Sequence, residues 1–151
     1  MTKLDEQFNA AVWIVQNLPK DGPINNSVDD QLRLYSLFKQ ATEGPCTTSK
    51  PSLFHVTERL KWNAWNKISE MDRDEAKARY IEKLLELCDR AEREHNLVEY
   101  LSDPKYTDDP KYMELLQQHA VLREKFAILG RSNVKGYEGK TITVKGIELT
   151  L

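Results

Sequence analysis

The sequence is short of the features that mark disulfide-stabilised or metal-binding proteins. Its 151 residues include two cysteines, Cys46 and Cys88, which lie far apart in the chain. Without a signal peptide, two such thiols are more typical of reduced cysteines than of a disulfide framework. The three histidines, His55, His95 and His119, belong to no CxxC, HExxH or clustered-carboxylate pattern. We therefore predict no metal site.

A surplus of charge and long apolar runs are also lacking. Charged residues make up 30% of the chain, but the formal net charge is only -2. This balance does not favour nucleic acid or an anionic membrane surface as a partner, and any anion site must be local. No apolar run approaches the length that spans a bilayer, and residues 1–6 are too polar for a signal peptide. We expect a cytoplasmic protein.

Sequence motifs typical of catalytic sites are missing as well. The sequence holds no nucleophile motif, no glycine-rich phosphate loop and no pair of carboxylates that stands out by its spacing. We therefore expect a protein that is not an enzyme and that needs no cofactor.

Helical periodicity is what the sequence does contain. Apolar spacing predicts a first helix over about residues 2–17, which Pro19 ends, and a second that begins near Ser27 or Val28. The rows expected to be buried are Phe8, Ala11, Val12, Val15 and Leu18 in the first helix, and Leu34, Leu37, Phe38 and Ala41 in the second.

Two further helices follow a polar loop at residues 42–51. The third carries Trp62 and Trp65, which we expect to be core anchors. The fourth opens at Asp72, an N-cap residue with Glu75 three positions later. Its apolar surface comprises Ala76, Tyr80, Ile81, Leu84, Leu85, Leu87, Cys88 and Ala91. The fold class predicted for residues 1–95 is all-α, with four helices.

Residues 96–151 form a C-terminal extension of different character. A tandem DPKY repeat is typical of a linker. Pro110 is predicted to start a helix over about residues 110–129. Strict alternation predicts a β-hairpin over residues 140–151, with Val144 opposite Ile147. Because a lone hairpin is unstable, it must pack on the helices, pair with a partner, or belong to a sheet outside this chain.

Three separate blocks carry a resemblance to a known family. They are LYSLFKQATEG at residues 34–44 with Lys50-Pro51 after it, KWNAWN at 61–66, and ARYI at 78–81. In order and spacing they resemble the acyl-CoA-binding protein family, over the stretch from Phe8 to about Leu87. The resemblance implies a four-helix bundle that binds medium- to long-chain fatty acyl-CoA esters without catalysis, as an intracellular carrier or pool former in lipid metabolism.

The resemblance also implies a ligand site. Tyr35, Lys39 and Lys61 match the family positions that hold the phosphates of coenzyme A, while Phe38 and Tyr80 match its aromatic positions at the adenine and the ligand. A lysine suits a phosphate as a point charge, and a tyrosine hydroxyl adds a directed hydrogen bond. Leu32 lies one helical turn before Tyr35 and is a candidate contact for the acyl chain.

Two departures from the family pattern bear on affinity. The family usually has tyrosine where Phe38 stands, so one hydroxyl is lost. The family lysine of the first helix falls at Gln16, which removes a cation.

Other interpretations remain open at this point. The chain could be the acyl-CoA-binding module of a larger acyl-CoA-metabolising enzyme, or a helical protein-interaction module with a vestigial ligand site. Trp13 and Ile14 lie at positions that are usually polar in the family. They indicate either extra packing or an exposed patch for a transient membrane or protein partner, a role that the C-terminal extension could also take.

Overall fold

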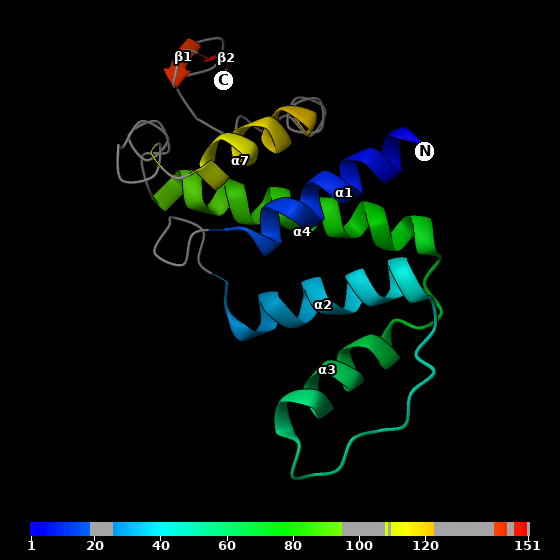
Figure 1. Ribbon diagram of the computed structural model, residues 1–151. Helices are drawn as coiled ribbons and strands as arrows, with labels where there is room; N and C mark the ends of the chain where they lie inside the picture. The colour runs from blue at the N-terminus through cyan, green and yellow to red at the C-terminus, as the bar shows by residue number, and fades with distance from the viewer. Residues whose placement is uncertain (19–25, 95–107, 109, 123–140, 145–146, 151) are drawn as a thin grey trace. The chain divides into compact units, whose positions relative to one another are not determined.

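A computed structural model describes residues 1–18, 26–94, 108, 110–122, 141–144 and 147–150 (Figure 1). The elements are α1 (Lys3–Gln16), α2 (Val28–Glu43), α3 (Val56–Lys67), α4 (Arg73–Glu94), α7 (Pro110–Val121), β1 (Thr141–Val144) and β2 (Ile147–Thr150). The four predicted helices of the N-terminal region are confirmed. The chain divides into two compact units, residues 1–8 with 26–83 and residues 9–25 with 84–151, which we describe separately.

Helix α2 of the first unit starts where the sequence predicts, with Ser27 as its N-cap. The Ser27 hydroxyl accepts a hydrogen bond from the Asp30 amide at 3.1 Å, and the Asp30 carboxylate accepts one from the Ser27 amide at 3.0 Å. Each side chain thus satisfies an amide that the first helical turn leaves unpaired. Lys83 of α4 reaches the same carboxylate at 2.9 Å, so one acidic residue both caps α2 and joins it to α4.

The end of α2 is fixed by four residues that we call the Gly44 junction: Gln40, Gly44, Trp65 and Arg73. Gly44 has φ +80°, a backbone conformation that favours glycine. A Cβ placed there would lie 2.9 Å from the Arg73 guanidinium, which donates a hydrogen bond to the Glu43 carbonyl. The Trp65 indole donates to the Gly44 carbonyl at 2.8 Å, and the Gln40 amide donates to two carbonyls of the α3–α4 turn. The junction therefore ties α2, α3 and α4 together.

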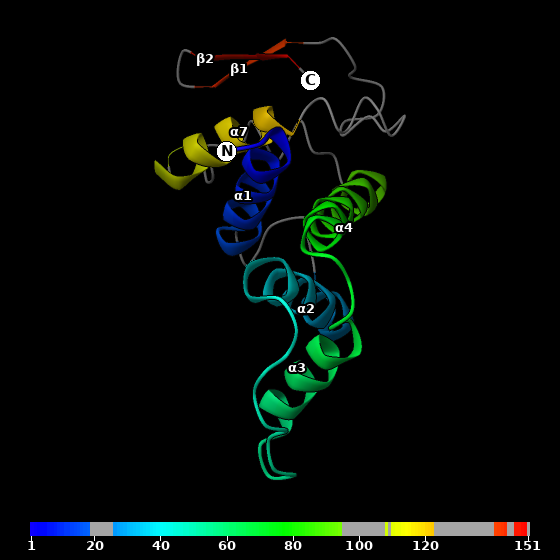
Figure 2. The same ribbon diagram turned by 90° about the vertical axis from the view of Figure 1, so that its right-hand side faces the viewer.

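The two tryptophans of α3 differ in role. Trp65 is 3% exposed, which confirms the prediction of a core anchor. Trp62 is only half-buried, and its indole donates to the Thr48 carbonyl at 2.8 Å while Lys50 lies over its ring. The core prediction for Trp62 is wrong, because this side of α3 covers the preceding loop rather than another helix. In both views α3 lies alongside α2 (Figure 1 and Figure 2).

Helix α4 begins as predicted at Asp72, whose carboxylate accepts from the Asp74 amide at 3.0 Å. The start of α1 is joined to it by an ion pair between Asp5 and Lys77, with a 2.6 Å N–O distance. Every residue of the predicted apolar surface of α4 is buried, on both sides of the boundary between the units.

The second unit corrects part of the interpretation of α1. Ile14 is completely buried and Trp13 is half-buried, so Ile14 is a packing residue and offers no exposed patch. Val12, Val15 and Leu18, which we expected in the buried row, are only half-buried. Phe8 and Ala11 of the predicted row are buried as expected, and Ala10 and Ile14 complete the buried face of the helix.

The described parts of the C-terminal extension agree with the sequence. Helix α7 starts at Pro110 as predicted and ends at Val121; the rest of the helix expected to residue 129 lies outside the described residues beyond Leu122. Strands β1 and β2 are antiparallel with Val144 opposite Ile147, which confirms the predicted register. The loop after Pro19 and the DPKY linker, apart from Asp108 and the residues of α7, also lie outside the described residues, and the division at residue 95 stays a prediction. None of the described helices is long and apolar enough to cross a membrane.

Candidate functional site

One side of α2 carries four of the six predicted site residues. Tyr35, Phe38 and Lys39 follow one another at i, i+3 and i+4, which places them together on the helix surface. Leu32 lies three residues before Tyr35. All four side chains are half-buried, so the face is built on a rigid element and remains accessible. We call Tyr35, Phe38, Lys39 and Lys61 the ligand face.

Helix α3 brings Lys61 to this face. Its ammonium nitrogen lies 5.2 Å from the centre of the Tyr35 ring, within the range of a cation–π interaction. Lys61 is exposed, and no carboxylate of the described residues forms a salt bridge with it. The ring thus holds a cation whose charge no described side chain neutralises.

Lys39 has a different environment. Glu43, one turn further along α2, forms an ion pair with it, and its ammonium lies 5.0 Å from the centre of the Trp65 ring. The hydrogen bond from Lys39 to Glu43 raises the pKa of Lys39 above its ordinary value. An incoming phosphate would therefore compete with Glu43 for Lys39. Glu43 is not among the predicted site residues, although its i, i+4 spacing from Lys39 is a signal in the sequence.

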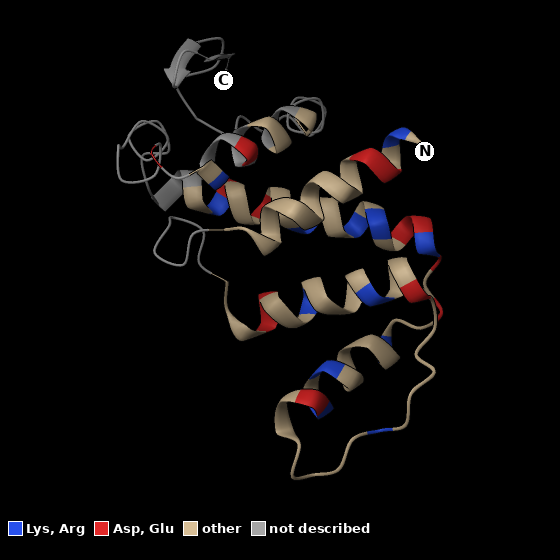
Figure 3. Ribbon diagram, viewed as in Figure 1, with Lys and Arg blue, Asp and Glu red and all other residues tan. Residues whose placement is uncertain are grey.

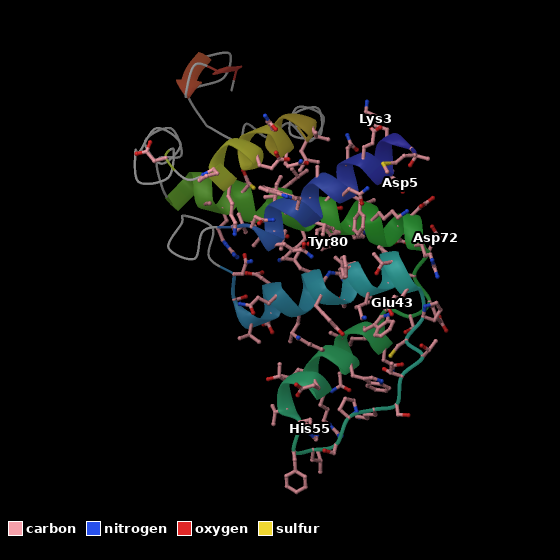
Figure 4. The ribbon with its side chains drawn as sticks, viewed as in Figure 1. Lys3, Asp5, Glu43, His55, Asp72 and Tyr80 are labelled. Carbon is pink, nitrogen blue, oxygen red and sulfur yellow. The ribbon has the colours of Figure 1, made fainter. Side chains whose placement is uncertain are left out.

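Phe8 of α1 connects Phe38 with Tyr80, the remaining site residue. Its ring stacks against Phe38 with centroids 6.5 Å apart and meets Tyr80 edge-on at 5.3 Å. The sequence predicts Phe8 only as a core residue, because its position in the apolar row of α1 carries no sign of a neighbouring site. Figure 4 shows Tyr80 on α4 and Glu43 at the end of α2.

Tyr80 is 3% exposed, so burial raises the pKa of its hydroxyl, which stays protonated at neutral pH. Within the described residues the hydroxyl has no hydrogen-bond partner. The site consequently has a cationic end, at Tyr35, Lys39 and Lys61, and an aromatic end, at Phe38 and Tyr80.

The two departures noted in the sequence fall at different places. Phe38 keeps a stacked ring at the aromatic end but supplies no hydroxyl. Gln16 is exposed on the part of α1 that belongs to the other unit. In the described part of the chain, no three histidine, cysteine, aspartate or glutamate side chains gather as metal ligands would.

Fold and site together define a helical binding domain whose candidate site has a cationic end and an aromatic end. The family model for acyl CoA binding protein matches residues 5–84. The chain therefore belongs to the acyl-CoA-binding protein family, whose domain binds acyl-CoA and is not catalytic.

Curated relatives show both short and long forms. The chain is 44% identical over 98 residues to acyl-CoA-binding protein homolog 3 of Caenorhabditis elegans, an alignment that covers 65% of this chain and 84% of that protein. It is 46% identical over 79 residues to acyl-CoA-binding domain-containing protein 4 of Homo sapiens, covering 52% and 30% respectively. With acyl-CoA-binding domain-containing protein 5 of Rattus norvegicus it shares 34% identity over 141 residues, or 90% of this chain and 27% of the relative. The chain thus spans less than a third of these two mammalian relatives.

Solved structures agree with the family. The acyl-CoA-binding protein of Moniliophthora perniciosa superposes with a TM-score of 0.58 at 35% identity, covering 80% of this chain and 97% of the other. Acyl-CoA-binding protein 2 of Oryza sativa gives a TM-score of 0.53 at 39% identity, covering 58% and 91%.

Proposed function

We propose that this chain binds medium- to long-chain fatty acyl-CoA esters and acts as a non-catalytic intracellular carrier and pool former. In this proposal Tyr35, Lys39 and Lys61 hold the phosphates of coenzyme A. Phe38 and Tyr80 contact the adenine end, and Leu32 contacts the acyl chain.

The observation that carries the proposal is the pairing of Lys61 with Tyr35. A lysine held over an aromatic ring, without a carboxylate partner among the described residues, keeps its full charge for an anion. Charge-assisted hydrogen bonds to phosphate contribute about 1.5 to 3 kcal/mol each. Lys39 adds a second cation within the same face once phosphate displaces Glu43.

The aromatic end supports the same ligand. The Phe38 ring is half-buried, which leaves part of it available to a purine base. The Tyr80 hydroxyl is protonated and lacks a partner among the described residues, so it can donate one hydrogen bond to the ligand. An adenine nucleotide with several phosphates fits these two ends together.

Approximate free energies indicate how much the acyl chain and the coenzyme A group each contribute to affinity. Burial of each methylene contributes roughly 0.8 kcal/mol, so a palmitoyl chain could add on the order of 10 kcal/mol before the cost of ordering. We therefore expect affinity to rise with acyl-chain length, and free fatty acid to bind poorly because it lacks the coenzyme A group.

Isothermal titration calorimetry tests the proposal with palmitoyl-CoA, coenzyme A and palmitate as separate titrants. We expect saturable binding of palmitoyl-CoA, weaker binding of coenzyme A and little binding of palmitate. Absence of saturable palmitoyl-CoA binding would contradict the proposal, and equal binding of palmitate would contradict the assignment of the cationic end to phosphate.

A second candidate is that this sequence acts as the acyl-CoA-binding module of a larger protein. It is favoured by the alignment with the rat relative, which covers 90% of this chain but only 27% of that protein. An antibody against residues 26–94 distinguishes the two on a denaturing gel of cell extract. A band near the 17.5 kDa of this chain supports an independent carrier, and a much larger band supports the module.

A further inference from the structure

A second surface of the first unit has no part in the ligand face. Within residues 53–60 lie four of the seven large apolar side chains that the described residues expose. We call them the 53–60 patch: Leu53 is 73% exposed, Phe54 94%, Val56 63% and Leu60 42%. Single exposed apolar residues are common, but four within eight residues indicate a surface that contacts something apolar.

The patch is presented by an ordered turn. The His55 amide donates to the Ser52 carbonyl at 3.1 Å, which makes Leu53 and Phe54 the two central residues of a four-residue turn. A hydrogen bond of 2.8 Å between the Ser52 hydroxyl and the His55 ring closes the same turn. The Arg59 guanidinium donates to the Pro51 carbonyl at 3.0 Å and fixes its base. Turn centres usually carry small or polar residues, whereas this one holds two large apolar side chains in the solvent.

Helix α3 extends the turn into a continuous surface. Val56 and Leu60 are four residues apart in the helix, so they lie on the same side, one turn from each other. Figure 4 shows His55 where the loop enters α3, at the tip of the unit. The patch therefore starts at a protruding tip and continues along one side of the helix.

The charges around the patch are strongly biased. Besides Lys61, which belongs to the ligand face, residues 50–67 hold three cations, Lys50, Arg59 and Lys67, against the single carboxylate of Glu58, although the whole chain has a net charge of -2. Figure 3 shows this bias on α3 and on the loop before it. Apolar side chains at a tip with cations behind them match a bilayer surface that contains anionic lipid.

We propose that the 53–60 patch docks this protein on anionic membrane surfaces, with Leu53 and Phe54 inserted among the lipid headgroups and the neighbouring cations against the lipid phosphates. A second copy of the chain suits the patch less well, because two copies would bring the same cationic segment together. The proposal does not depend on whether the ligand face binds acyl-CoA.

Vesicle flotation with the full chain tests this proposal. The vesicles contain either phosphatidylcholine alone or phosphatidylcholine mixed with phosphatidylserine. We expect the wild-type protein to float with the mixed vesicles and not with phosphatidylcholine alone. Leu53→Ser/Phe54→Ser should lower the partition coefficient at least about tenfold, because it removes both apolar side chains of the tip. Val28→Ser, which changes a similarly exposed residue of α2 outside the patch, should float like the wild type.

Several results would overturn the proposal. Wild-type protein that does not float with the mixed vesicles would do so, as would a double variant that floats equally well. Sedimentation velocity showing a wild-type dimer and a monomeric double variant would assign the patch to a second copy. A loss of palmitoyl-CoA binding by the double variant in the absence of vesicles would assign it to the ligand site. A different result would leave membrane docking intact. If neither the wild type nor the double variant binds acyl-CoA and the flotation results are as expected, only the proposed function is contradicted.

Discussion

The Gly44 junction and the ligand face draw on the same short block of sequence but are built in opposite ways. At the junction, Trp65 and Gln40 are buried and donate hydrogen bonds to backbone carbonyls. On the ligand face, Tyr35 is half-buried and Lys61 is exposed without a described carboxylate partner. Gln40 and Gly44 therefore serve stability, whereas Tyr35, only a few residues away, is available to a ligand.

This difference shows how one sequence block, residues 34–44, can contribute both to the fold and to the candidate ligand site. Within residues 34–44, Gln40 donates hydrogen bonds to the α3–α4 turn, whereas Tyr35, Phe38 and Lys39 form part of the half-buried ligand face. Substitutions at the junction should change the free energy of unfolding, and substitutions on the face should change ligand affinity. Each prediction below can break or sharpen this separation.

The largest effect is expected for Trp65→Ala. The change removes a buried aromatic side chain and leaves the Gly44 carbonyl without its donor, which should lower the free energy of unfolding by about 3 to 5 kcal/mol. Trp62→Ala is the matched control: its ring is half-buried on a loop, so a loss of about 1 kcal/mol is expected. Urea denaturation followed by circular dichroism measures both. Equal losses would show that the loop contact stabilises the fold as much as the junction does.

These two tryptophans also show what the sequence could and could not predict. Periodicity placed all four helices, and the apolar surface of α4 is buried as predicted. Whether the Trp62 side chain is buried depends on the path of residues 44–55. These residues have no periodic apolar pattern from which their contacts could be predicted. The exposed state of Leu53 and Phe54 escaped prediction for the same reason.

The assignment of the ligand site stays a prediction, but part of its geometry can be compared with the sequence. The family blocks named Tyr35, Lys39 and Lys61, and the structure brings Lys61 over Tyr35. Phe8 was missed because an apolar residue in a helical row is the same in sequence whether it touches core or site. Its contacts with Phe38 and Tyr80 exist only once α1, α2 and α4 are assembled.

Lys61→Ala tests whether the ligand face affects ligand affinity independently of the stability that the Gly44 junction provides. Loss of this cation is expected to weaken palmitoyl-CoA binding by about 1.5 to 3 kcal/mol, roughly tenfold to a hundredfold, with little change in unfolding. Calorimetry and thermal denaturation provide the two measurements. Lys67→Ala, at an exposed lysine at the end of the same helix, is the control and should bind normally. If Lys61→Ala unfolds the domain, the lysine belongs to the fold and the site assignment is wrong.

Gly44→Ala tests the junction from the backbone side. The φ of +80° and the Arg73 guanidinium, 2.9 Å from the new Cβ, should together cost about 1 to 3 kcal/mol of stability. Ligand affinity at a temperature where the protein is folded should change little. The double variant Gly44→Ala/Arg73→Ala separates the two causes. A stability no lower than that of Arg73→Ala alone would show that steric contact, and not φ, sets the cost.

The smallest effect is expected at the ion pair between Asp5 and Lys77, which is half-buried and belongs to neither region. The hydrogen bond from Lys77, with those from Thr2, lowers the pKa of Asp5 from 3.8 to about 2. Because the folded pKa is depressed, the stabilisation is complete above pH 3.8 and is lost as the pH falls from 3.8 to about 2. The same pair raises the pKa of Lys77, so the stabilisation is also lost in strongly alkaline solution above the ordinary value of 10.5.

Asp5→Asn should therefore melt slightly below the wild type at pH 6, and the two melting temperatures should converge near pH 2. Asp74→Asn is the matched control, because Asp74 lies 3.7 Å from the same lysine and is far more exposed. Its effect should be smaller at every pH. A difference between Asp5→Asn and the wild type that persists undiminished at pH 2 would show that the carboxylate charge is not its source. The stabilisation would then come from the hydrogen bonds that Thr2 exchanges with residue 5 at the start of α1.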